Sequence, residues 1–216
     1  FIPILEALKD QLKTVEKYVI LCDESEIPET TLENTISYEE YIKDGDEDYK
    51  WPALEDDAAC ALCYTSGTTG NPKGVLYSHK SNIYHATSAY AALTIDKDDC
   101  ILMVVPMFHV LAWGIPYFGP MTGNKLVMPG MGMEGDSLYE LIDKEGVNST
   151  FGVPTVWMQL LAYCRENNKV LDSVKNTIIG GSALSLAMLK EFDEVHDVNV
   201  IHAWGMTEMS PLGTTN

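Results

Sequence analysis

Strand-like and helix-like patterns alternate along most of the chain. Short apolar runs bounded by Gly, Pro, Asn or Asp predict strands, and apolar positions three or four residues apart predict helices. The expected strands cover residues 59–65, 74–77, 100–105, 124–128, 149–151, 176–180 and 198–202. The expected helices cover residues 79–92, 109–119, 135–145, 154–167 and 185–195. This alternation favours an α/β fold in which helices flank mostly parallel sheets.

The N-terminal part of the chain has a different pattern. Apolar side chains at helical spacing over residues 3–17 predict an amphipathic helix, and residues 18–21 form an apolar run that predicts a strand. Residues 22–57 are acidic and lack periodicity, apart from one expected helical turn at residues 38–42. We expect residues 22–57 to form an acidic surface connection within one domain.

Acidic residues dominate the charge. The chain has 32 Asp and Glu against 14 Lys and Arg, a net charge of −18. Because this field repels polyanions, we expect no nucleic-acid partner. A small phosphate ligand remains compatible, since residues 1–57 carry 17 acids and 5 bases while residues 65–133 carry 3 acids and 4 lysines. No run approaches the roughly 18 apolar residues of a membrane span, so we expect no transmembrane segment.

Five cysteines are scattered through apolar stretches. Their odd number argues against a disulfide framework and favours a reducing compartment, so we expect a cytoplasmic location. Cys60 and Cys63 have the spacing of a redox or zinc pair. On the expected buried strand, however, these two positions point to opposite faces, and no second pair completes a zinc site. We therefore interpret both as small core residues.

The sequence TSGTTGNPKG at residues 65–74 directly follows an expected strand. Its glycines allow close backbone approach, its hydroxyl groups donate hydrogen bonds and its lysine adds positive charge, which together suit a phosphate. A hairpin turn alone requires no such run of small hydroxyls, and the Gly-Lys-Ser/Thr ending of a P-loop is missing. The candidate phosphate-binding residues are Thr65, Ser66, Gly67, Thr68, Thr69, Gly70 and Lys73.

Four later residues are candidates for ligand contact. Gly180 and Gly181 follow an expected strand, where small residues let a ligand lie against the backbone. Trp204 ends another strand and offers a flat face for stacking a purine. His109 follows Phe108 in an apolar stretch, and the residues alone leave open whether it is a core histidine or a functional one.

Four segments together resemble the adenylate-forming superfamily, which includes acyl-CoA synthetases, the adenylation domains of peptide synthetases and firefly luciferase. They are the loop at residues 65–74, Pro106-Met-Phe-His109 with Trp113-Gly114, the Gly-Gly segment at residues 180–184, and Ala203-Trp-Gly-Met-Thr-Glu208. The order of the four segments matches the family, and their residues resemble those of fatty acyl-CoA synthetases most. The resemblance implies that the chain is the central portion of the large N-terminal AMP-binding domain, without the small C-terminal domain.

The resemblance also implies roles for individual residues. Catalysis would use Lys73, His109, Thr207 and Glu208, with Thr207 on the α-phosphate and Glu208 as a Mg²⁺ ligand. Adenine would lie between Gly180, Gly181, Ser182 and Ala183 on one side and Trp204 on the other, and Gly205 would also belong to the nucleotide site. The acyl pocket would include His109, Val110, Trp113 and Gly205, with Leu111 and Ile115 nearby.

The implied reaction has two steps. A carboxylate attacks Mg·ATP to form acyl-AMP, and coenzyme A then displaces AMP to form a thioester. Because a carboxylic acid is already ionised at neutral pH, the first step requires charge neutralisation and alignment rather than a general base. Two alternatives stay open: transfer to a carrier-protein thiol, and nucleotide binding without catalysis. We expect the isolated chain to have little activity, and its sequence specifies neither acyl chain length nor oligomeric state.

Overall fold

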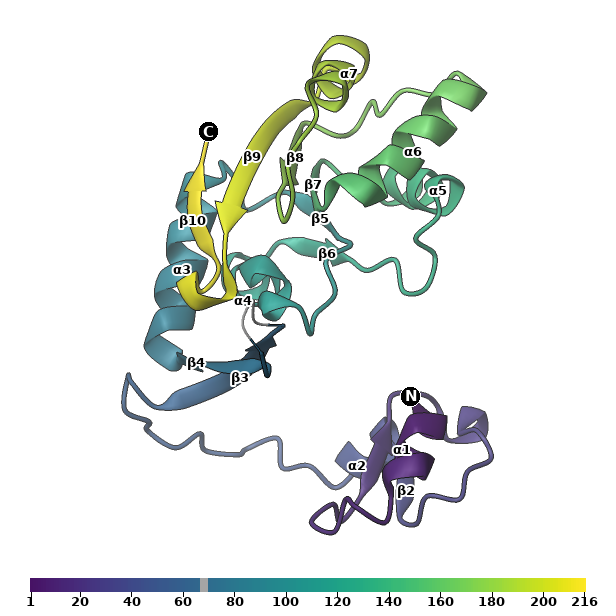
Figure 1. The fold of residues 1–216 in the computed structure, drawn as a ribbon, viewed down its shortest axis with the longest axis vertical. Coiled ribbons are helices and arrows are strands. Elements are labelled where there is room, and N and C mark those ends of the chain that lie inside the picture. Colours follow the sequence, from purple (N-terminus) through teal and green to yellow (C-terminus); the bar gives the residue numbers. More distant parts are fainter. Residues whose placement is uncertain (67–69) are drawn as a thin grey trace. The chain divides into compact units, whose positions relative to one another are not determined.

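The computed structural model describes residues 1–66 and 70–216 (Figure 1). The chain divides into two compact units, Phe1–Ala53 and Leu54–Asn216, which are described separately. Within the described ranges, no helix combines the length and apolar character that crossing a membrane requires. All five cysteines lie in those ranges, and each is free.

The first unit is a small α/β element. Its helices and strands are α1 (Ile2–Leu8), β1 (Tyr18–Ile20), the 3-10 turn η1 (Glu24–Glu26), β2 (Thr35–Ser37) and α2 (Tyr38–Ile42). Strands β1 and β2 pair in parallel. Ser37 caps α2 by accepting a hydrogen bond from the Glu40 amide at 3.2 Å. The predicted strand at residues 18–21 and the helical turn at residues 38–42 are confirmed, whereas β2 was not predicted.

The predicted helix over residues 3–17 is wrong in its length, because α1 ends at Leu8. No residue of α1 is buried. A short helix without a packed apolar face gains little from tertiary contacts, so propagation past the first two turns is weakly favoured. The apolar spacing beyond Leu8 therefore continues only as isolated turns, such as the Val15 amide donating to the Leu12 carbonyl.

The second unit is built around a six-stranded sheet within the described residues, in the order β10-β9-β8-β7-β5-β6. Its strands are β5 (Cys100–Met103), β6 (Lys125–Val127), β7 (Ser149–Gly152), β8 (Asn176–Ile179), β9 (Asn199–Gly205) and β10 (Leu212–Thr215). All neighbours are parallel except β10, which runs antiparallel to β9. The mostly parallel α/β fold is thus confirmed, and β10 is the strand that the apolar pattern did not predict.

Helices cover both faces of this sheet (Figure 1). Leu102 and Val104 pack against α5 (Gly135–Glu145), α6 (Pro154–Asn167) and α7 (Leu186–His196). Ile101 and Met103 point to the opposite face, where α3 (His79–Ala92) and α4 (Ile115–Thr122) lie. Because β5 is buried on both faces, its sequence is continuously apolar rather than alternating.

Strands β3 (Ala59–Thr65) and β4 (Lys73–Ser78) form a separate antiparallel hairpin. The strand at residues 59–65 was predicted, but the expectation that it is buried on both faces is wrong. Cys63 is buried, whereas Leu62 and Tyr64 are exposed. The interpretation of Cys60 as a core residue is also wrong, since this side chain is exposed. The reason is that only one face of the hairpin packs against the rest of the unit, through Cys63 and Tyr77.

The predicted helix over residues 109–119 begins later than expected, at Ile115. Residues 110–114, called here the left-handed segment, all have positive φ, from 40° at Val110 to 87° at Gly114. This conformation costs a non-glycine residue about 1–2 kcal/mol. Pro116 lies in the first turn of α4, where its missing amide costs no hydrogen bond. The helix therefore starts only after the left-handed segment.

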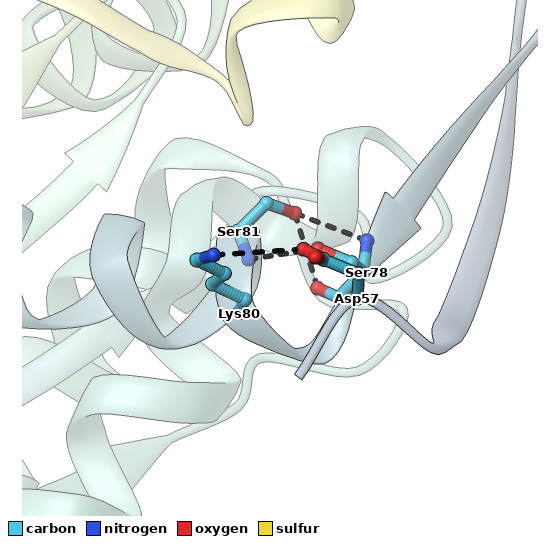
Figure 2. Close-up of polar contacts among 4 residues, drawn as sticks. All are labelled: Asp57, Ser78, Lys80 and Ser81. Atoms are coloured by element: carbon cyan, nitrogen blue, oxygen red, sulfur yellow. Dashed lines mark hydrogen bonds and ion pairs between the residues drawn. The ribbon is translucent and has the colours of Figure 1, made fainter. Parts of the chain in front are cut away.

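Helix α3 has a well-defined beginning (Figure 2). The Ser78 hydroxyl accepts from the Ser81 amide at 3.1 Å, and the Ser81 hydroxyl accepts from the Ser78 amide at 3.2 Å. This reciprocal capping box satisfies two otherwise free amides of the first turn. Lys80 and Asp57 lie 3.7 Å apart beside it, as an exposed ion pair. The cap fixes the position of α3, whose later turns reach the site described next.

Candidate active site

A cavity of about 230 Å³ lies at the carboxyl ends of β7, β8 and β9. Open α/β sheets bind ligands at these strand ends. Eight residues selected from the sequence line it: His109, Val110, Trp113, Gly180, Gly181, Trp204, Gly205 and Thr207. The structure therefore brings three of the four recognised segments to one site, although they are far apart in sequence.

At the end of β8, the backbone of two glycines, Gly180 and Gly181, forms the cavity wall. A Cβ atom on Gly180 would lie 3.0 Å from the Ala203 carbonyl oxygen and 3.3 Å from the Trp113 ring. Gly181 has a φ of +79°, a conformation that other residues rarely adopt. The backbone of Gly181 thus favours glycine strongly, a Cβ atom on Gly180 would be tightly packed, and the indole of Trp113 lies beside both.

The end of β9 is held against β10 at a glycine. A Cβ atom on Gly205 would collide with the backbone carbonyl of Pro211. The Met206 amide donates to the same carbonyl oxygen at 3.0 Å. Trp204 is 54% exposed, and a Cβ atom on Gly213 would lie 2.7 Å from its ring, so the indole rests on the β10 backbone. This arrangement leaves an exposed part of the ring for stacking.

The two histidines that line the cavity differ in exposure. His109 is exposed, so it is not a buried core histidine. His85 of α3 is 9% exposed, and its Nε2 atom has no hydrogen-bond partner among the described residues. Burial lowers the pKa of His85 to about 4, so the imidazole is neutral at physiological pH.

The other predicted site residues lie outside this lining. Thr65 and Lys73 pair across the β3–β4 hairpin. Ser66 follows Thr65 directly, and Gly70 lies three residues before Lys73. Ser182, Ala183 and Glu208 lie next to the lining residues in sequence, and Ser182 and Glu208 are exposed. Three phosphate-loop positions lie outside the described residues: Gly67, Thr68 and Thr69.

The sequence analysis missed the apolar end of the cavity. Its walls there come from Ala89 and Leu93 on or just after α3, Phe151 of β7, Ile178 of β8 and Leu212 of β10. Ile178 could have been found, because it lies on a strand whose end was already assigned to the site. Phe151 lies on β7, whose end had no assigned residue. Helix α3 offered no such signal, since its buried face combines Asn82 and His85 with two alanines.

Among the described residues, no group of three His, Cys, Asp or Glu side chains is placed to hold a metal ion. Glu208 is an exposed carboxylate next to Thr207 of the cavity wall. Mg²⁺ is commonly bound by one or two carboxylates together with the phosphates of a nucleotide. A single carboxylate at this position therefore fits Mg²⁺ bound with a nucleotide, but not a metal cage made by the protein alone.

The fold and the cavity define a class: an α/β domain with a ligand site at the ends of parallel strands, lined by glycines and a half-exposed tryptophan. Residues 2–216 match the family model described as "AMP-binding enzyme". The chain therefore belongs to the AMP-binding enzyme family.

Curated relatives match the whole chain. It is 46% identical over 218 residues to a medium-chain fatty-acid–CoA ligase from Ectopseudomonas oleovorans and 44% identical to a 3-methylmercaptopropionyl-CoA ligase from Ruegeria pomeroyi. A solved long-chain fatty-acid–CoA ligase from Archaeoglobus fulgidus is similar, with a TM-score of 0.78 and 25% identity, over 98% of this chain and 46% of that one. The two curated alignments cover 100% of this chain and 40% of each relative, so the chain spans about 40% of their length.

Proposed function

We propose that the protein activates a carboxylic acid with ATP, forming an acyl-adenylate, and then transfers the acyl group to coenzyme A. The observation that carries this proposal is the composition of the cavity at the ends of β7, β8 and β9. One end has exposed backbone at Gly180 and Gly181 beside Trp204 and Thr207, which suits a nucleotide. The other end is walled by Phe151 and other apolar side chains, which suit a hydrophobic acid.

The first step requires the developing charge on the phosphates to be neutralised. We assign this role to Lys73, the phosphate-loop residues 65–70 and Glu208, which would hold Mg²⁺ against the nucleotide phosphates. Thr207 would contact the α-phosphate from the cavity wall. Mg²⁺, when bound, supplies positive charge to the departing pyrophosphate. The acid carboxylate is already ionised at neutral pH, so the chain needs no general base for this step.

The acyl pocket is the second part of the assignment. His109, Val110, Trp113 and Gly205 line the cavity where the carboxylate of the acid would meet the nucleotide. Both curated relatives are CoA ligases, which favours coenzyme A as the acceptor and a fatty or similar apolar acid as the substrate. Free cysteines at all five positions support action in the reducing cytoplasm.

The test is an ATP–pyrophosphate exchange assay on the protein expressed from its complete gene, with fatty, aromatic and amino acids. Exchange that depends on one class of acid, followed by thioester formation with coenzyme A, is the expected result. Exchange without transfer to coenzyme A would favour a carrier-protein thiol as acceptor. A protein that binds ATP without exchange for any acid would refute the enzymatic proposal and leave nucleotide binding.

Replacing Lys73 or Glu208 by alanine tests the assigned roles. Each loses one charge from the proposed phosphate site, and a loss of at least about 1.4 kcal/mol of transition-state stabilisation corresponds to a tenfold slower exchange. Lys97→Ala and Glu166→Ala are matched controls, since these side chains are exposed on other segments. If Lys73→Ala and Glu208→Ala exchange pyrophosphate as fast as the controls, the assignment is wrong.

A further inference from the structure

Tyr77 lies outside every segment that carries the proposed function. It is on β4, three residues after the end of the TSGTTGNPKG loop, and it is 2% exposed. A tyrosine buried to this degree requires a partner for its hydroxyl group. The structure provides one: the Tyr77 hydroxyl donates to the backbone carbonyl of Thr207.

The surroundings of Tyr77 join three segments of the site. Its ring packs with Cys63 of β3 and with Val110, the first residue of the left-handed segment. Leu111 and Trp113 of the same segment pack on the edge of this cluster. The hydroxyl group reaches across to η3 (Thr207–Met209), which carries Thr207 and Glu208. One side chain thus contacts the phosphate-loop hairpin, the proposed acyl-pocket segment and the turn that carries Thr207 and Glu208.

The Thr207 carbonyl has few other contacts. The Ser210 amide approaches it at 3.3 Å, near the long limit for such a bond. The next fixed point of the turn is the Met206 amide, which donates to the Pro211 carbonyl at 3.0 Å. The Tyr77 hydroxyl is therefore the main contact that sets how Thr207 and Glu208 lie relative to β4.

We propose that Tyr77 is a positioning residue, whose hydroxyl fixes the Thr207–Met209 turn so that Thr207 and Glu208 meet the nucleotide in register with the phosphate loop. This inference rests on the proposed function for the roles of Thr207 and Glu208. Burial, followed by the nearby Cys63 and Glu208, raises the pKa of Tyr77. The hydroxyl consequently stays protonated and remains a hydrogen-bond donor.

Tyr77→Phe, in the protein expressed from its complete gene, removes the donor and keeps the buried ring. We expect amide hydrogen exchange over residues 206–212 to accelerate about tenfold in the nucleotide-free protein, while β7 and β8 keep their protection. In the exchange assay, kcat/KM for Mg·ATP should fall about tenfold and KM for the acid should change less than twofold, because Tyr77 orients the phosphate side of the site.

Two variants complete the experiment. Tyr139→Phe removes a hydroxyl group from a partly buried tyrosine on α5, and it should alter neither measurement. In a Thr207→Ala, Glu208→Ala background, Tyr77→Phe should add little further loss of kcat/KM, because both positioned side chains are already missing. Unchanged hydrogen exchange over residues 206–212 would overturn the proposal, and so would equal acceleration in β7 and β8, which indicates a general packing role. Because hydrogen exchange needs no turnover, absent activity would refute the proposed function without deciding the role of Tyr77.

Discussion

The two ends of the cavity differ in their walls, which are backbone at one end and side chains at the other. At the proposed nucleotide end, the walls are main chain at Gly180, Gly181 and Gly205, held within a few ångströms of neighbouring backbone or rings. At the proposed acid end, the walls are side chains, including Ala89 and His85 of α3. A backbone wall cannot be altered without moving strands, whereas a side-chain wall changes with one substitution. We infer that the first end is fixed by the fold, and that in the proposed function the second end would determine which acid is accepted.

The largest expected effect comes from adding one carbon at the backbone end. Gly205→Ala would place its Cβ against the Pro211 carbonyl, so β9 and β10 must separate where Trp204 and Thr207 enter the cavity. Displacement of binding groups by about 1 Å can cost roughly 100-fold in rate. We expect pyrophosphate exchange to fall by about that factor, together with a lower melting temperature.

The control for this substitution is Gly132→Ala. A Cβ atom there would meet nothing closer than 3.4 Å, which is ordinary van der Waals contact. Gly132→Ala should leave both the rate of pyrophosphate exchange and the melting temperature unchanged. If Gly205→Ala behaves like Gly132→Ala, the backbone end tolerates more than the close contacts suggest, and the contrast between the two ends fails.

The same contrast explains what could be predicted from the sequence. Gly181 and Gly205 can be recognised in the sequence, because a positive φ or a close backbone contact leaves no place for a side chain there. The sheet was also predictable, since strands such as β5 and β7 are buried runs between turn residues. Strand β10 was not, because its sequence, Leu-Gly-Thr-Thr, has neither apolar alternation nor a continuous apolar run.

The proposed acid end of the cavity could not be predicted from the sequence, because it forms through tertiary packing and no periodic pattern marks its residues. The buried positions of α3 are Asn82, His85, Ala86 and Ala89, which have helical spacing but too few large apolar groups to mark a face. The left-handed segment was mistaken for helix because Val, Leu, Ala and Trp carry no local signal for positive φ. Only the tertiary arrangement, with Gly114 beside the His85 ring, shows why the chain takes this path.

A smaller effect, on specificity, is expected from a substitution at the side-chain end. Ala89→Val adds two methyl groups to the cavity wall, where the acyl chain would end. Each methylene that no longer fits costs about 1–3 kcal/mol, or at least about tenfold in kcat/KM. We expect this loss for the longest accepted acid, with shorter acids and KM for Mg·ATP nearly unchanged, in exchange assays over a series of chain lengths.

Ala86→Val is the matched control for that experiment. Ala86 is equally buried on the same helix, at 1% exposed, but it does not line the cavity. Any general effect of overpacking α3 should therefore occur in both variants, whereas the shift toward shorter acids should occur only in Ala89→Val. The same shift in both variants would show that the position of α3, rather than the side chain at the cavity wall, determines which acyl chain length is accepted.

The smallest effect at neutral pH concerns His85, the polar group of the side-chain end. Its pKa is about 4 in the folded protein and about 6.5 when unfolded, so the unfolded chain binds more protons between these values. Stability from the neutral imidazole is fully present above pH 6.5 and is lost as the pH falls toward 4, amounting to about 2 kcal/mol between pH 7 and pH 5. His85→Gln removes this titration, while the lowered pKa of His196 acts equally in both proteins. Urea unfolding at several pH values should therefore give a shallower pH dependence for the variant. Parallel curves would mean that His85 is hydrated or paired, and that the acid end of the cavity is more polar than its lining indicates.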